Sequence, residues 1–268
     1  MNSSLSAHLP VQQLWQKWSI AFRIMPVLGL IAILKLLSHK YGFELLELNA
    51  LFTSLVAGTI FLLGFLISGV LTDYKESEKI PSEIAGCLRT VFDDTYTIYK
   101  TKNSDAAIRF LHHQKELVLA ITDWFYKKQR TQTILNMISA MNDFFIEFDK
   151  DGVQANYIIK LKNEQNLLRR LLLRVDTIRD TGFVGSAYAI VEVMGVVIAF
   201  GLIVIDIQPF YASLFFTLLV SFLIAYMVLL IKDLDNPFDH SAKGETGTEI
   251  SLKPIHDHCR FIESTTLG

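Results

Sequence analysis

Apolar residues are gathered in long blocks along the chain. Four blocks stand out, at about residues 22–38, 50–72, 183–205 and 209–231. A helix formed by the second block, which carries no charge, spans roughly 34 Å at 1.5 Å per residue, enough to cross the hydrocarbon core of a bilayer. The third and fourth blocks are separated only by residues 206–208, which indicates a tight antiparallel hairpin. The pattern therefore predicts four transmembrane helices.

Two of the blocks contain a charged residue. The first block is interrupted by Pro26 and Lys35. We expect the Lys35 ammonium, near one end of the span, to extend toward the membrane surface. The third block contains one acid, Glu192, near its middle. A charge in a span is costly, so Glu192 is a candidate functional residue unless it is protonated or paired with a neighbouring group.

Residues 73–180 follow a different pattern, with charged residues throughout and apolar residues mostly at three- and four-residue steps. This spacing predicts several long amphipathic helices. Turn-forming residues predict breaks at 102–105 and 149–152. The polar tail after the last block is expected to lack regular structure. The chain is thus an all-α membrane protein, divided into a cytosolic N-terminal segment (1–21), two spans (22–72), a cytosolic helical region (73–180), a transmembrane hairpin (183–231) and a cytosolic tail (232–268).

The placement of basic residues predicts the orientation. The loop at 206–208 has no lysine or arginine, and the loop at 39–49 has only Lys40, whereas Lys17 and Arg23 lie at the N-terminus. Under the positive-inside rule both termini are cytoplasmic. We therefore expect a multi-pass membrane protein with both termini in the cytoplasm.

Composition narrows the function classes. The chain has 268 residues, of which 51% are hydrophobic and 19% charged, and its net charge of −2 gives no indication of nucleic-acid binding. No phosphate-binding glycine loop, nucleophile elbow or His-Glu-x-x-His helix occurs, so we expect neither an enzyme nor a cofactor. Residues 256–259 (His-Asp-His-Cys) include zinc-ligand types, but adjacent positions in a tail rarely close a tetrahedral site, so no metal site is predicted.

The second span carries a stripe of unusual composition. On a helix, the stripe residues follow steps of three and four and share one face: Ser54, Gly58, Phe61, Phe65, Ser68 and Thr72. The other side is aliphatic and is expected to face lipid. Small residues on a membrane helix commonly serve close packing, which is the simpler interpretation. Alternatively, several copies of the helix could surround a pore, in which the two phenylalanines form an apolar constriction and the hydroxyls keep the flanking path wet. Asp73 and Glu76 would then lie at the cytoplasmic mouth.

Several short motifs resemble those of bestrophin channels. The stretch from Ala57 to Phe65 is similar to the neck helix of that family, and the segment ending at Pro81 is similar to the proline segment that follows it. Leu234-Asp-Asn-Pro-Phe238 and Cys259-Arg-Phe-Ile-Glu263 resemble two motifs found after the last span. The order of spans and the long helical region fit the same family. The chain thus resembles a divergent bacterial bestrophin, and the resemblance implies a location in a bacterial inner membrane.

The resemblance implies a pentameric ion channel with one central pore. Phe61 and Phe65 would line its neck, and Ala57 would face the same axis. The arginine and tryptophans that follow the neck in the family are replaced here by Asp73, Tyr74 and Lys75, so the resemblance implies no anion or cation preference. The acidic run of the animal calcium clasp is also missing.

Two other functions remain open. The protein could be a non-conducting membrane scaffold or signalling protein whose helical region recruits a partner. It could also be a small transporter that depends on Glu192 for coupling. The partners expected for the channel are further copies of the chain, the lipid bilayer and inorganic ions.

Overall fold

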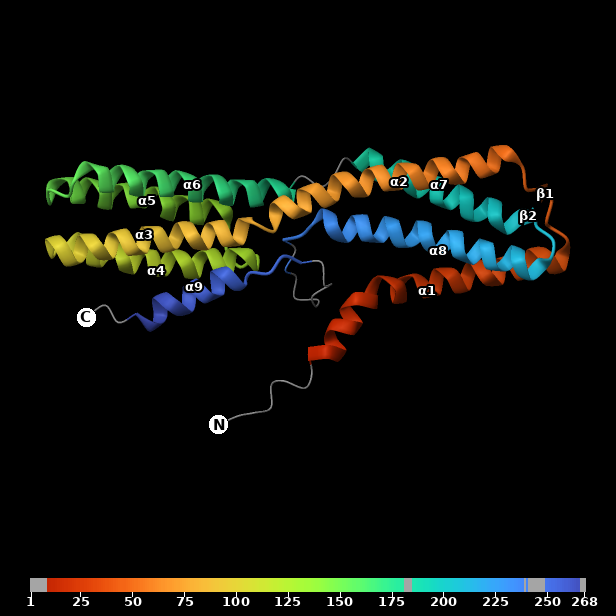
Figure 1. Cartoon of the computed structure of the whole chain (residues 1–268), viewed down its shortest axis with the longest axis horizontal. Coiled ribbons are helices and arrows are strands. Elements are labelled where there is room, and N and C mark those ends of the chain that lie inside the picture. The colour runs from red at the N-terminus through yellow and green to blue at the C-terminus, as the bar shows by residue number, and fades with distance from the viewer. Residues whose placement is uncertain (1–8, 181–184, 239, 241–248, 266–268) are drawn as a thin grey trace. The chain divides into compact units, whose positions relative to one another are not determined.

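The computed structural model describes residues 9–180, 185–238, 240 and 249–265, and this part of the chain is almost entirely helical (Figure 1). It divides into two compact units. Residues up to 74, together with 185–236, form the first unit, and the second contains residues 75–180 and the described residues after 236. The prediction of a predominantly α-helical protein is confirmed. The described residues also contain a pair of two-residue strands, which the sequence pattern did not predict.

The first unit contains the apolar helices α1 (Leu9–Tyr41), α2 (Ala50–Ser77), which continues into the second unit, α7 (Gly185–Val204) and α8 (Phe210–Asp235). Within the described residues, α1, α2 and α8 contain stretches long and apolar enough to cross a membrane, and Tyr188–Val204 is a shorter apolar helix. The start of the expected third span, at residues 181–184, lies outside the described residues. The predicted hairpin of the last two apolar helices is present, because α7 and α8 pack against each other across a short connection.

The core of this unit lies between α2, α7 and α8. Leu63 and Val70 of α2 are buried there against Val191 and Ile224. Part of the aliphatic side of α2 therefore contacts the protein's own helices, whereas Ile60 and Leu71 on the same helix are 39% and 40% exposed. Glycine permits the close approach of α7 and α2, since a Cβ at Gly201 would lie 2.3 Å from the Phe52 ring.

The ends of α1 and α7 are joined by an arrangement that the sequence pattern did not predict. Strands β1 (Leu46–Glu47) and β2 (Ile205–Asp206) pair in parallel and connect the two short loops. Beside them, the Lys35 side chain is fully buried, and its ammonium lies 2.7 Å from Glu44 Oε1 and donates to the Ile205 carbonyl at 2.6 Å. The ammonium of Lys35 therefore binds acceptors of the same chain beside the two loops.

The second unit is built on helices α3 (Ile80–Lys102), α4 (Asp105–Phe125), α5 (Thr131–Lys150) and α6 (Ala155–Asp180). Both predicted breaks are confirmed. Asn103 ends α3 in a left-handed conformation and Ser104 caps α4. Gly152, with φ +68°, follows α5. A further break, at 126–130, was missed because its sequence contains no glycine or proline. There the Arg179 guanidinium donates to the Phe125 carbonyl at 2.9 Å and caps the end of α4.

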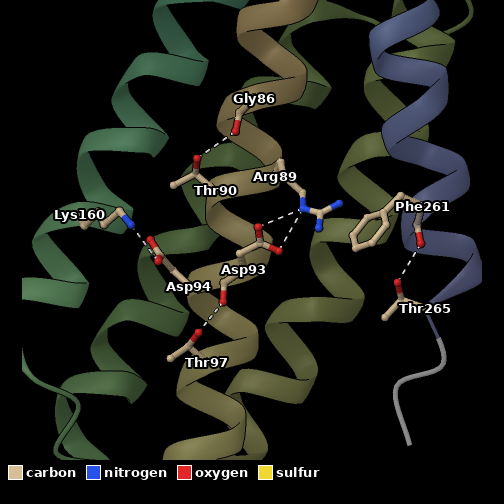
Figure 2. Close-up of polar contacts among 9 residues, drawn as sticks. All are labelled: Gly86, Arg89, Thr90, Asp93, Asp94, Thr97, Lys160, Phe261 and Thr265. Carbon is tan, nitrogen blue, oxygen red and sulfur yellow. Dashed lines mark hydrogen bonds and ion pairs between the residues drawn. The ribbon is translucent and has the colours of Figure 1, made fainter.

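The tail also differs from the prediction. Residues Lys253–Ser264 form helix α9, which packs on α3 and α4, so the expectation of an irregular tail was wrong for this segment. Ile255, His258 and Ile262 are buried on one side of it. The Arg89 guanidinium of α3 lies 3.6 Å from the centre of the Phe261 ring, as a cation–π contact (Figure 2). The sequence did contain a signal for this helix, because its buried residues recur at three- and four-residue steps between polar residues.

Candidate functional site: the exposed face of α2

Helix α2 has one covered and one uncovered face. Asn49 caps its first turn by accepting a hydrogen bond from the Phe52 amide at 2.9 Å. The side chains of Phe61 and Phe65 are 78% and 71% exposed in the single chain. All of the other residues predicted to line or narrow a pore are exposed on the same helix: Ser54, Ala57, Gly58, Ser68 and Thr72. The sequence-predicted stripe is thus a continuous face that the described helices of the same chain leave open.

The composition of this face differs from that of the other exposed apolar faces. On α7, the exposed side chains include Val193, Val196 and Phe200, and on α8 they include Phe215 and Leu219. These are bulky apolar groups suited to lipid contact. The α2 face instead combines hydroxyls, alanine and glycine with two aromatic rings. Hydroxyl and backbone groups at the surface of a membrane helix favour contact with water or with another helix over contact with lipid.

The glycines on this face do not serve packing inside the chain. Among the residues that the structure describes, a Cβ added at Gly58 or Gly64 would meet nothing within 4 Å. The packing interpretation therefore applies only between copies of the chain. The Thr72 hydroxyl donates to the Ser68 carbonyl at 2.9 Å, so its donor is satisfied within the helix and its oxygen remains an acceptor.

Two acidic residues predicted for the mouth follow on the same helix. α2 continues without interruption through Asp73 to Ser77. The Glu76 Oε2 atom lies 3.3 Å from Nη2 of Arg174 on α6, and both side chains are about half exposed. An exposed pair of this kind contributes little stability, about 0–1 kcal/mol. The pairing reduces the negative charge that Glu76 presents to solvent.

Glu192 has a partner in the structure. Its carboxylate forms an ion pair with the Lys232 ammonium of α8. The described helix α7 begins at Gly185, so Glu192 lies about two turns from the start of the helix. An acid that is paired with a cation of the neighbouring helix needs no coupling role to explain its presence in an apolar helix. This geometry fits the interpretation of Glu192 as a paired structural acid.

Two adjacent acids of α3, Asp93 and Asp94, contact different cations (Figure 2). Asp93 accepts from Arg89 Nε at 3.0 Å, whereas Asp94 lies 2.9 Å from the Lys160 ammonium and raises the pKa of Lys160 through this hydrogen bond. In the tail, burial and then the nearby Arg89 charge lower the pKa of His258 to about 4. Among the described residues, no three His, Cys, Asp or Glu side chains lie together as a metal site.

Comparison with known proteins identifies the fold. No protein-family model matches the sequence. No curated protein matches it either. Among solved structures, a variant of a bacterial bestrophin homologue from Klebsiella pneumoniae aligns with 92% of this chain and 99% of its own, at 15% identity and a TM-score of 0.75. A structure of that homologue solved by zinc anomalous phasing gives 15% identity and a TM-score of 0.73, and covers 91% and 96% of the two chains. The resemblance seen in the short motifs is thus confirmed at the level of structure, and the chain has the fold of the bacterial bestrophin homologues.

Proposed function

We propose that this protein is the subunit of a homo-oligomeric, pentameric ion channel that passes small inorganic ions through a central pore lined by α2. One observation carries the proposal: the stripe of small, hydroxylated and aromatic residues is left uncovered while the opposite face of α2 is buried. One helix per chain cannot enclose a water path, so several copies must contribute. The fold shared with bestrophin homologues supports the same arrangement.

In this channel, Phe61 and Phe65 form the neck and Ala57 faces the same axis. Rings of apolar side chains at a constriction can gate conduction by dewetting. Ser54, Gly58, Ser68 and Thr72 line the path on either side of the phenylalanines. Asp73 and Glu76 stand at the cytoplasmic mouth, where the pairing of Glu76 with Arg174 tunes the charge that ions meet.

The proposal includes the membrane topology. Residues 22–72 and 183–231 form the spans of a bacterial inner-membrane protein, and residues 73–180 and 232–268 lie in the cytoplasm with the N-terminus. The scarcity of basic residues in the loops at 39–49 and 206–208 supports this orientation.

The test is the Phe61→Ala plus Phe65→Ala variant, recorded as single channels in a planar bilayer with asymmetric salt. We expect a higher conductance and more frequent opening than in the unmodified protein, because the apolar rings no longer exclude water. The reversal potential of the unmodified channel gives the sign of the conducted ion in the same recording.

The matched control is Phe215→Ala plus Phe216→Ala. These two phenylalanines are also exposed, on α8, and are 59% and 48% accessible in the single chain. Removing them deletes the same chemical groups from another helix, so we expect an unchanged conductance. Equal conductance for the unmodified protein and both double variants would rule out the neck assignment.

Thiol labelling separates the channel from a non-conducting scaffold. Cysteine in place of Phe61 or Ser68 should react with hydrophilic thiol reagents in the assembled protein, whereas cysteine in place of Val193 on α7 should not. Cys259 is partly exposed and should first be replaced by serine, while Cys87 is buried. Protection of Phe61→Cys and Ser68→Cys would favour the scaffold.

A further inference from the structure

An apolar groove runs between α1, α7 and α8 of the first unit. It is lined mainly by aliphatic side chains, including those of Val27, Ile31, Val196, Ala199, Ala225 and Leu229. Its volume is about 430 Å³. Sites for small organic ligands commonly have volumes of roughly 300–1,000 Å³. The groove is therefore large enough to hold an extended hydrocarbon chain in part.

One end of the groove is charged. Arg23 and Glu192 belong to its lining, and each forms an ion pair with a residue of α8: Arg23 with Asp233 and Glu192 with Lys232. Lys232 follows Val228 and Leu229 by one helical turn, so it lies on the groove side of α8. The groove thus leads from a cluster of four charges into an apolar interior.

The two cations at this end keep unused donors. Among the described residues, Arg23 contacts a carboxylate only through Nη1, which lies 3.5 Å from both oxygens of Asp233. Its side chain is 47% exposed, and that of Lys232 is 46% exposed. A guanidinium has five N–H donors and an ammonium has three, so both can bind a further anionic oxygen. Asp233 and Glu192 therefore hold the two cations in place, while some N–H donors of Arg23 and Lys232 are still available.

We propose that this groove binds a glycerophospholipid, with one acyl chain along the apolar floor and the phosphodiester hydrogen-bonded to Arg23 and Lys232. The occupant follows from charge and polarity. A purely apolar neighbour would leave both ion pairs facing hydrocarbon at a cost, whereas a small polar ligand would leave the apolar interior unfilled. Trp18 and Phe22 are exposed and precede Arg23 by five residues and by one residue, and both suit the interfacial depth at which phosphates lie.

The test is native mass spectrometry of the delipidated, assembled protein titrated with palmitoyl-oleoyl-phosphatidylglycerol and, separately, with the matching diacylglycerol, which lacks the phosphate. We expect bound phosphatidylglycerol and much weaker binding of diacylglycerol. Arg23→Gln plus Lys232→Gln should weaken phosphatidylglycerol binding by about tenfold or more, a loss of about 1.4 kcal/mol or more, because the charged hydrogen bonds to the phosphodiester are removed. Ala225→Trp, which fills the groove, should weaken it similarly.

The matched control is Val197→Trp, which adds the same bulk to an exposed position of α7 outside the groove. It should bind phosphatidylglycerol as the unmodified protein does. If Ala225→Trp fails to assemble, the glutamine variant decides, because its two side chains are half exposed. Unchanged binding in the glutamine variant, or equal binding of diacylglycerol, overturns the proposal. The measurement needs no conduction, so its outcome is separate from that of the channel proposal.

Discussion

Replacement of Lys35 by methionine should destabilise the first unit strongly. The Lys35 ammonium is fully buried and contacts three acceptors: Glu44 Oε1 at 2.7 Å and the carbonyls of Ile205 at 2.6 Å and Ile203 at 3.3 Å. Methionine fills a similar space and removes all three contacts. The Glu44 side chain is only 10% exposed, so its carboxylate would lose its main counter-charge. Breaking one side of a buried pair typically costs about 3–5 kcal/mol.

A second variant separates the effect of the unpaired charge from the effect of the lost hydrogen bonds. The Lys35→Met plus Glu44→Gln variant removes both charges, so the unpaired carboxylate no longer contributes. Only the two carbonyls lose their donor, and each such loss costs about 1–3 kcal/mol. We therefore expect the double variant to be more stable than Lys35→Met alone. Recovery of this kind identifies the buried ion pair as the source of the loss.

Thermal unfolding of the purified protein in detergent measures both effects. A loss of about 3–5 kcal/mol should lower the Tm of a chain of this size by about 10 °C. The control is Lys40→Met, on the exposed end of the same helix, which should leave the Tm nearly unchanged. If Lys35→Met behaved like Lys40→Met, the Lys35 ammonium would have to lie in water or among headgroups, and the reasoning from burial would be refuted.

Three further predictions follow from single contacts. The pKa of His258 is about 4 in the folded protein against 6.5 for free histidine, so the unfolded form binds the proton first. The packing of α9 on α3 and α4 should therefore be fully stable above about pH 6.5 and weaken as the pH falls toward 4. Hydrogen exchange of the α9 amides should become faster over this range in the unmodified protein, but not in His258→Leu. Gly201→Ala should lower the Tm, because its Cβ would overlap the Phe52 ring, whereas Gly29→Ala, which meets nothing within 4 Å, should not. Glu192→Gln should leave conductance unchanged if its ion pair is structural, and a complete loss of ion flux with intact assembly would restore the transporter.

Local pattern was sufficient to locate most of the helices. The apolar blocks and the three- and four-residue periodicity correspond to α1, α2, α8 and the helices of the second unit, because both signals arise from neighbours along one helix. The breaks after Lys102 and Lys150 followed from turn-forming residues. The break after Phe125 has no such residues, and the carbonyl there is capped by Arg179, which is distant in sequence. The short motifs around Phe61, at the segment ending at Pro81, and after the last span, together with the order of the apolar blocks, were enough to indicate the fold.

The sequence by itself determined which residues share a face of α2, but only the tertiary structure decided which face is covered. An aliphatic face has the same pattern whether it meets lipid or another helix, because both neighbours are apolar. Burial of Leu63 and Val70 against α7 and α8 left the stripe of Phe61 and Phe65 open. The pairing of Lys35 with Glu44 and of Glu192 with Lys232 was likewise decided in three dimensions, since a charge in an apolar block requires a partner but its sequence does not specify which one.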